Sequence, residues 1–372
     1  MNLPFADALL HWYVCRQLSG PTEQYDPSIR GEIQRILLVL TTGLGDAILS
    51  TPAFSAVRKA FPHSEMRLFC RAAWAPLFLQ DPNFTEVIPY RGKYRQFFST
   101  LNKLRHYSPD LVVILHGNDP DIVPISFLSG SRFIIRVPTH GTRYRFLLSN
   151  RSRAQDASAL PDVHYIENRL RVLDTLGIAR DSSVPVVHLD QARRSAALSR
   201  LGRFLKNAPY WVLHGNAADP YKSWPMNHLR ELVSVARQRF PDHRVILTGT
   251  RRERNILKTL ADEFEGVHVV AGEYDIVGTA AILANAACVV APDTGILHLA
   301  AAFDRPVVGL YAPTNANLVG PRTRSKSVIV IQKPQTCDPC LEKKCPYTPH
   351  HCMNQINVDE VLIALSRHLA SA

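Results

Sequence analysis

Short runs of apolar residues alternate with segments of helical spacing along most of the chain. Nearly continuous Val, Ile and Leu runs are typical of strands buried on both faces of a parallel sheet, whereas apolar residues three or four positions apart indicate an amphipathic helix. In the first half this pattern predicts strands at residues 35–40, 67–70, 110–115 and 133–137, and helices at 47–61 and 163–176.

The alternation starts again after a polar stretch without periodicity at residues 179–185. Two successive series of this kind predict an α/β protein with two doubly wound domains. We therefore divide the chain into an N-terminal extension (1–34), a first Rossmann-like domain (35–182) and a second one (183–372). The second series predicts strands at 210–214, 244–248, 267–271, 288–291 and 307–311, where it closes, and helices at 229–240, 251–264, 276–285 and 296–302.

The composition narrows the class of protein only slightly. Of the 372 residues, 46% are hydrophobic and 20% charged, which excludes disordered and collagen-like chains. Lys and Arg number 43 against 32 Asp and Glu, and the net charge of +11 favours anionic partners: nucleic acid, phosphorylated ligands or an acidic membrane surface. No apolar run reaches the roughly 18 residues of a membrane span, and the N-terminus lacks the basic region of a signal peptide, so we expect a cytoplasmic protein.

Two strand-to-helix turns carry candidate chemistry, because ligands of open α/β sheets bind at the carboxyl ends of the strands. Residues 41–46 read Thr-Thr-Gly-Leu-Gly-Asp, without the third glycine of a dinucleotide fingerprint. Asp46 there is interpreted either as a helix N-cap or as a group that points into the crevice. In the second turn, residues 291–298, the backbone N–H groups of Thr294 and Gly295 can bind a pyrophosphate, and His298 lies one helical turn further on the same side.

Two further loops of the second half hold polar residues after predicted strands. Lys222 precedes Trp224 and Pro225, and it is either a solvated charge or a phosphate ligand. Glu253 follows Thr248-Gly249-Thr250, and it either interacts with the helix dipole or binds ligand hydroxyls.

In this order and spacing, the segments resemble the ADP-heptose:lipopolysaccharide heptosyltransferases, glycosyltransferase family 9, and most closely the heptosyltransferase II branch. The resemblance rests on Gly-Asp-Ala-Ile-Leu-Ser-Thr-Pro at residues 45–52, on His214 with Lys222-Ser-Trp-Pro, and on Pro-Asp-Thr-Gly-Ile-Leu-His-Leu-Ala-Ala at residues 292–301. It spans roughly residues 35 to 369. It implies a GT-B architecture, with two Rossmann-like domains that face a cleft, the first for the acceptor and the second for the nucleotide-sugar. Members of the family are inverting transferases that require no catalytic metal.

The resemblance also implies roles for individual residues. Asp46 matches the general base of the family, and the expected donor-binding residues are Lys222, Glu253, Asp293, Thr294, Gly295 and His298. The loop before Lys222 reads Asn-Ala-Ala where the family often has Thr or Ser, a departure that bears on its phosphate contacts. For an anionic acceptor, guanidinium groups near the ends of the first-domain strands are suitable ligands, and we expect Arg71, Arg143 and Arg145 to bind it.

Four of the seven cysteines crowd into residues 337–352, with His350 and His351 beside the last of them. Four thiolates can hold a structural zinc or iron ion, for which Cys337, Cys340, Cys345 and Cys352 are the candidate ligands. Free thiols and disulfides are the alternatives.

The expected function is therefore transfer of heptose from ADP-heptose to an anionic lipopolysaccharide inner-core acceptor, in contact with the cytoplasmic face of the inner membrane. One alternative keeps the transferase and changes the acceptor to a protein or another glycan. A basic, metal-containing nucleic-acid-binding protein is disfavoured, because the basic residues do not cluster with interleaved aromatics.

In the N-terminal extension, Phe5, Leu9, Trp12 and Tyr13 have two interpretations: they dock on the protein's own surface, or they rest on a membrane.

Overall fold

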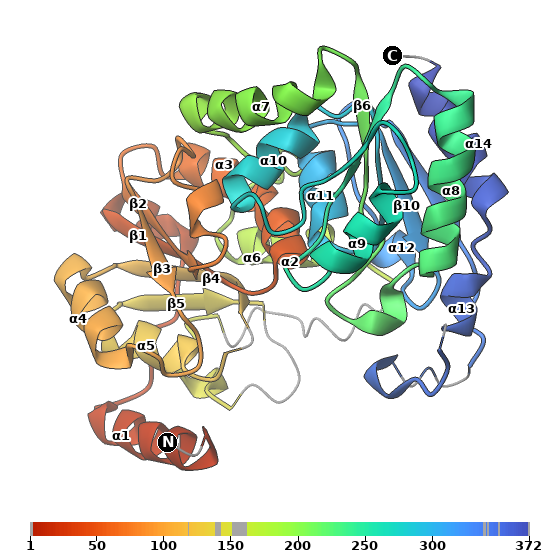
Figure 1. Ribbon diagram of the computed structural model, residues 1–372. Coiled ribbons are helices and arrows are strands. Elements are labelled where there is room, and N and C mark those ends of the chain that lie inside the picture. Colours follow the sequence, from red (N-terminus) through yellow and green to blue (C-terminus); the bar gives the residue numbers. More distant parts are fainter. Residues whose placement is uncertain are drawn as a thin grey trace. The chain divides into compact units, whose positions relative to one another are not determined.

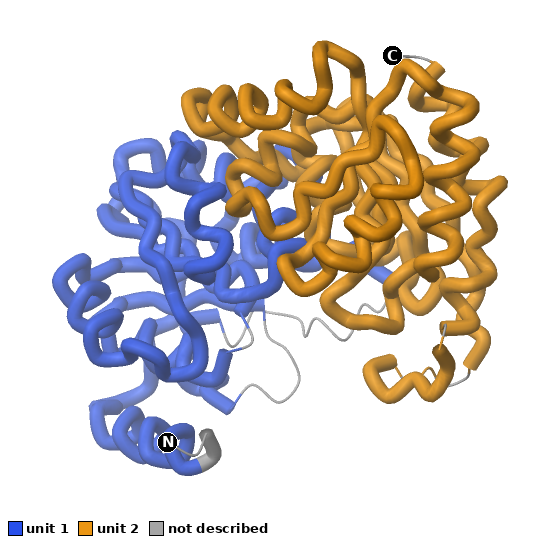
Figure 2. Tube along the Cα trace, in the orientation of Figure 1, with its two compact units in different colours: residues 1–183 blue, residues 184–372 orange. Residues whose placement is uncertain are grey.

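The computed structural model describes residues 3–117, 119–137, 143–150, 162–337, 340, 342–348 and 350–370. The chain forms two compact units, residues 1–183 and 184–372 (Figure 2). Each unit has its own parallel sheet, and each is described by itself.

Unit 1 contains a five-stranded sheet of order β3-β2-β1-β4-β5, in which every pair of neighbours is parallel (Figure 1). The apolar side chains of the central strand, residues 36–40, are fully buried because they are covered on both faces of the sheet. The strands are β1 (Arg35–Thr41), β2 (Glu65–Arg71), β3 (Glu86–Tyr90), β4 (Leu111–Gly117) and β5 (Phe133–Arg136).

Helices cover both faces of this sheet. On one face α6 (Tyr165–Thr175) packs against α2 (Leu44–Ser50) and α3 (Pro52–Ala60). On the other face α4 (Phe97–Tyr107) and α5 (Ile122–Leu128) pack together, and the N-terminal α1 (Leu3–Gln17) is added outside α5.

Unit 2 contains a six-stranded parallel sheet of order β11-β10-β9-β6-β7-β8. One face carries α8 and α14 in a continuous apolar core, and α7 packs against α10 elsewhere in the unit. The strands are β6 (Tyr210–Leu213), β7 (Arg244–Leu247), β8 (Val267–Val269), β9 (Val289–Pro292), β10 (Val307–Tyr311) and β11 (Val328–Gln332); the main helices are α7 (Gln191–Leu205), α8 (Met226–Arg239), α9 (Arg254–Ala261), α10 (Ile276–Ala284), α11 (Gly295–Ala302) and α14 (Val358–Leu369).

The predicted fold class, two doubly wound parallel-sheet domains, is confirmed. Two details of the prediction are wrong. The single helix at 47–61 is two helices, because Pro52 has no N–H to continue the first and instead begins the second. The second series does not close at 307–311, since β11 pairs with β10 as a further edge strand.

Candidate functional site

Asp46 lies in the first turn of α2, directly after the carboxyl end of β1. Its carboxylate accepts a hydrogen bond from Thr42 Oγ1 at 3.1 Å and another from the guanidinium of Arg169 in α6. The Asp46 side chain keeps 36% of its surface exposed. The N-cap interpretation is wrong, because Gly43 holds the cap position and no side chain caps the helix. The Asp46 carboxylate is therefore held by two hydrogen bonds and stays accessible to solvent, near the carboxyl end of β1.

Arg169 and His116 were not predicted, and both lie beside this carboxylate. The Arg169 side chain is 6% exposed, and its Nε and Nη1 have no hydrogen-bond partner among the described residues. Burial lowers the pKa of Arg169, and the charge of Asp46 opposes this effect. Burial, with the charge of Arg169, also lowers the pKa of His116 at the end of β4 to about 4, so its imidazole is neutral near pH 7. Sequence spacing gives no signal for Arg169, because it is 123 residues away from Asp46.

The three predicted acceptor arginines occupy different surroundings in unit 1. Arg71 ends β2 and forms an ion pair of 3.0 Å with the buried Asp119, while Arg143 pairs with Asp7 of α1. Arg145 is exposed in the short helix η3 (Arg145–Leu147). Two of the three are thus already engaged by carboxylates.

In unit 2, Lys222, Asp293 and His298 converge from three elements. Lys222 ends the short helix η5 (Pro220–Lys222), Asp293 follows β9, and His298 lies in α11. Lys222 Nζ donates to Asp293 Oδ2 at 2.7 Å, and His298 Nε2 lies 3.6 Å from Asp293 Oδ1. Burial would raise the pKa of Asp293, but the hydrogen bond from His298 and the charge of Lys222 outweigh it and lower that pKa to about 2. The carboxylate is therefore ionised at any physiological pH.

Several polar atoms at the same sheet edge are buried without a partner in the described part of the chain. Buried polar atoms are nearly always hydrogen-bonded, so an unsatisfied group at a strand end indicates a place where a ligand or water binds. Burial raises the pKa of Tyr311, and the negative charge of Asp293 raises it further. The atoms are Thr294 Oγ1, His298 Nδ1, Tyr311 Oη and Thr314 Oγ1.

Glu253 is bound to its own turn. Its Oε2 accepts the backbone N–H of Thr250 at 2.6 Å, and a Cβ at Gly249 would lie only 2.8 Å from that oxygen. Burial lowers the pKa of His214, and the negative charge of Glu253 opposes this by raising it. The Nδ1 atom of His214 lies 3.0 Å from Thr248 Oγ1. Glu253 therefore belongs to the carboxyl edge of β6 and β7, next to the strand that precedes Lys222.

The four clustered cysteines line one small pocket together with His351 and Tyr221. Among the described residues, no group of three or more His, Cys, Asp or Glu is arranged to hold a metal ion, and the structural zinc or iron stays a prediction. The segment lies close to η5: the helix η6 (Glu342–Lys344) packs against it, and Lys343 pairs with Asp219 at 3.2 Å. Although distant in sequence, the cysteine segment thus supports the loop that carries Lys222.

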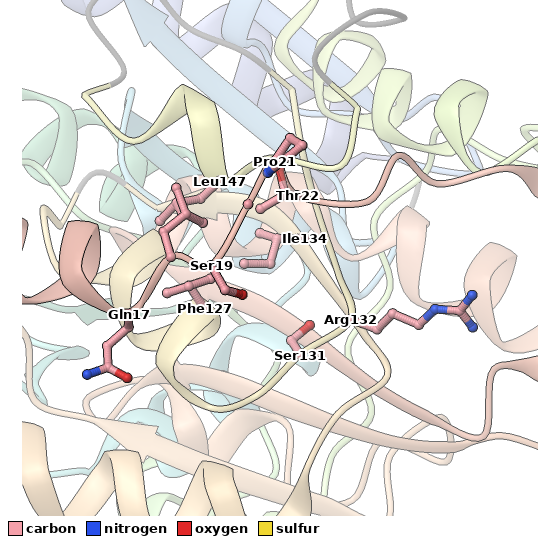
Figure 3. Close-up of a pocket in the computed structure, with 11 residues that line it drawn as sticks. Gln17, Ser19, Pro21, Thr22, Phe127, Ser131, Arg132, Ile134 and Leu147 are labelled. Carbon is pink, nitrogen blue, oxygen red and sulfur yellow. The ribbon is translucent and has the colours of Figure 1, made fainter.

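A larger pocket, of about 260 Å³, lies in unit 1 at the amino end of β5 (Figure 3). The segment after α1, Phe127 of α5 and Leu147 line it, and Arg132 at its rim pairs with Glu23 and Glu32. Asp46 and Arg71 lie at the opposite, carboxyl ends of their strands. This pocket therefore contains none of the candidate groups.

Two Rossmann-like parallel-sheet units, each with a carboxylate at the carboxyl edge of its sheet, match the GT-B fold of glycosyltransferases. The chain belongs to glycosyltransferase family 9 (heptosyltransferase), whose family model matches residues 130–351. It is therefore an enzyme of glycosyl transfer, and the nucleic-acid-binding alternative is not favoured.

Individual relatives match between 79% and 91% of the chain. Lipopolysaccharide heptosyltransferase 1 of Pseudomonas aeruginosa is 29% identical over 334 residues, covering 85% of this chain and 88% of the relative. Lipopolysaccharide heptosyltransferase 2 of Salmonella typhimurium is 24% identical over 79% of this chain and 87% of its own length. The structure of E. coli ADP-heptose LPS heptosyltransferase II superimposes with a TM-score of 0.75 at 21% identity, covering 91% of this chain and 99% of that one.

Proposed function

We propose that this enzyme transfers heptose from ADP-heptose to an anionic inner-core acceptor of lipopolysaccharide, with inversion at the anomeric carbon. The names of its relatives support lipopolysaccharide as the acceptor and ADP-heptose as the donor. The observation that carries the proposal is the Lys222–Asp293–His298 group. It places a lysine cation at the carboxyl end of β9, beside buried polar atoms that have no partner among the described residues.

In this proposal the donor binds to unit 2. The leaving diphosphate lies against Lys222 and the N–H groups of Thr294 and Gly295, which are at the start of α11. Asp293 and His298 hold the lysine and the turn in place, and Glu253 binds hydroxyl groups of the nucleotide-sugar. The Ser223 hydroxyl accepts the N–H of Ala217 at 3.0 Å, so the unusual Asn-Ala-Ala loop is ordered without its own hydroxyl side chains.

The acceptor binds to unit 1, where Asp46 acts as general base. As the acceptor oxygen bonds to the anomeric carbon of heptose, its proton passes to the Asp46 carboxylate and the bond from that carbon to the diphosphate oxygen breaks. The electron pair of the broken bond stays on ADP, whose added charge Lys222 stabilises. Arg71, Arg143 and Arg145 attract the phosphates or carboxylates of the acceptor. This scheme uses no metal.

Mass analysis of products formed from ADP-heptose and a defined core oligosaccharide tests the proposal. The wild type should add one heptose, and Asp46→Asn should lower turnover by about 100-fold while ADP binding is unchanged. Asp174→Asn, at an exposed carboxylate of α6 that pairs with Arg180, is the matched control and should leave turnover unchanged. Near-normal turnover in Asp46→Asn would remove this residue from the mechanism, and transfer only to a protein or an unrelated glycan would replace the acceptor.

A further inference from the structure

Helix α1 has two apolar faces. Ala6, Leu10 and Val14, spaced four apart, are at most 8% exposed and pack into the core of unit 1. Asp7 fixes the helix further, since it accepts a hydrogen bond from Tyr94 Oη at 3.0 Å and pairs with Arg143. The helix is therefore an attached part of the unit, and its second face needs a separate explanation.

The second face consists of Phe5, Leu9, Trp12 and Tyr13, which we call the outer stripe. These side chains are 64%, 50%, 52% and 39% exposed, so the interpretation that they dock on the protein's own surface is wrong. Their spacing places them along one side of the helix, and it continues to Arg16, whose guanidinium carbon lies 4.6 Å from the centre of the Trp12 ring. Large apolar side chains gathered on a surface mark an interaction site.

We propose that the outer stripe binds the surface of an anionic lipid bilayer. Trp and Tyr beside Phe and Leu are the side chains that settle at the boundary between headgroups and acyl chains. Helix α1 contains no acidic residue besides the paired Asp7. It carries the exposed Arg16, and the loop whose Tyr94 bonds Asp7 carries the exposed cations Arg91, Lys93 and Arg95. Together with the net charge of +11, these cations are attracted to an anionic leaflet.

The helix rests on the bilayer rather than crossing it. None of the described helices is long and apolar enough to span a membrane, and the inner face of α1 is occupied by the core of unit 1. The inference rests on the proposed function in one respect: a lipid-linked acceptor places the reaction at a bilayer. Shallow binding through one helix would keep unit 1 next to that acceptor and still allow the enzyme to leave.

Flotation with vesicles tests the inference. Wild-type protein should bind vesicles containing about 30% phosphatidylglycerol, and binding should weaken with pure phosphatidylcholine or at 0.5 M salt. Phe5→Ser with Leu9→Ser and Trp12→Ser should reduce binding at least tenfold. The matched control is Ile256→Ser with Ile363→Ser, two residues of unit 2 that are 52% and 54% exposed, and it should bind like the wild type.

Three further measurements separate the outcomes. Circular dichroism establishes that the triple variant keeps its fold, and Trp12→Ser alone provides a milder perturbation that should weaken binding severalfold. Turnover on a water-soluble core oligosaccharide should be unchanged in all variants, so a failure of the proposed chemistry is recognised independently of membrane binding. Equal vesicle binding by wild type and triple variant would overturn the inference, as would a wild-type dimer that the triple variant converts to monomer.

A second observation, independent of the first, concerns Arg169. Two nitrogens of the buried Arg169 guanidinium, Nε and Nη1, have no partner among the described residues, which is costly. Its Nη2 nevertheless donates to Asp46, and its Cζ lies 5.3 Å from the centre of the Tyr165 ring. We infer that Arg169 is a positioning residue, which holds the Asp46 carboxylate in the orientation needed to receive the acceptor proton. The neutral imidazole of His116 completes its surroundings without adding a second positive charge.

Kinetics of Arg169→Met and Arg169→Lys test this role, which rests on Asp46 being the base. Arg169→Met should lower kcat about 100-fold with acceptor KM and ADP affinity within twofold, and Arg169→Lys should recover at least a tenth of wild-type kcat. Arg171→Met, on the same helix, is the control and should leave kcat unchanged. Equal kcat in the Met variant and wild type would overturn the inference, as would equal losses in Met and Lys; normal turnover in Asp46→Asn would instead show that the proposed base is wrong.

Discussion

Asp293→Asn tests whether the ion pair in unit 2 stabilises the folded state as its geometry indicates. The substitution keeps the shape of the side chain and removes the charge that Lys222 and His298 stabilise. The Asp293 side chain is only 11% exposed, so solvent screens these interactions weakly.

The magnitude follows from the pKa of Asp293. Its pKa falls from an ordinary 3.8 to about 2 in the folded protein. At about 1.4 kcal/mol per pH unit, ionisation of this carboxylate adds roughly 2 kcal/mol to the free energy of unfolding near pH 7. Because the folded pKa is the lower one, this contribution is fully present above pH 3.8 and is lost as the pH falls toward 2. By pH 3 about half of it should remain.

Urea unfolding at pH 7 and pH 3 measures the effect. Trp211 and Trp224 are both buried in unit 2, so their fluorescence follows this unit in a background where Trp12 and Trp74 are replaced by Phe. The wild type should exceed Asp293→Asn by roughly 2 kcal/mol at pH 7, and the difference should be about half as large at pH 3.

Asp262→Asn, at an exposed carboxylate of the same unit, is the control and should stay within about 0.5 kcal/mol of the wild type at both pH values. A gap between wild type and Asp293→Asn that is the same at both pH values would refute the reasoning, because it would show that the carboxylate contributes through packing and not through its charge.

Three further predictions concern ligands and the cysteine segment. Lys222→Ala should weaken ADP binding about tenfold in calorimetry, because a charge-assisted contact to phosphate is lost. Lys258→Ala, at an exposed lysine of α9, is the control and should leave ADP affinity unchanged. Equal affinities of wild type and Lys222→Ala would exclude Lys222 from the donor site. Turnover on a phosphorylated acceptor should fall faster with salt than ADP binding falls, and parallel decreases would argue against charge recognition in unit 1. Cys340→Ser with Cys345→Ser should lower the melting temperature and weaken ADP binding severalfold, because η6 packs against the helix that carries Lys222. Elemental analysis of the same preparations measures zinc and iron. Unchanged ADP affinity would show that the cysteine segment does not support the donor site.

The strands and the strand-edge motifs were accessible from the sequence because both are local. A buried parallel strand needs a continuous apolar run, so residues 35–40 and 307–311 were recognisable without any partner. The turns that end in Asp46 and Asp293 follow such runs directly, and in each unit the parallel sheet places the turns after its own strands at one edge. The segments at residues 45–52, 214–225 and 292–301 together, in their order and spacing, also indicated the family, which the family model confirms.

Only the tertiary structure decided which groups meet. Arg169 reaches Asp46 across 123 residues and Lys222 reaches Asp293 across 71, and no periodicity reports such a pair, because it depends on how α6 and η5 pack. For α1 the sequence showed apolar residues on every side, and only packing against unit 1 separated the buried Leu10 from the exposed Trp12. Local patterns determine which elements form, whereas contacts between distant elements determine which charges are paired and which apolar surfaces stay in water.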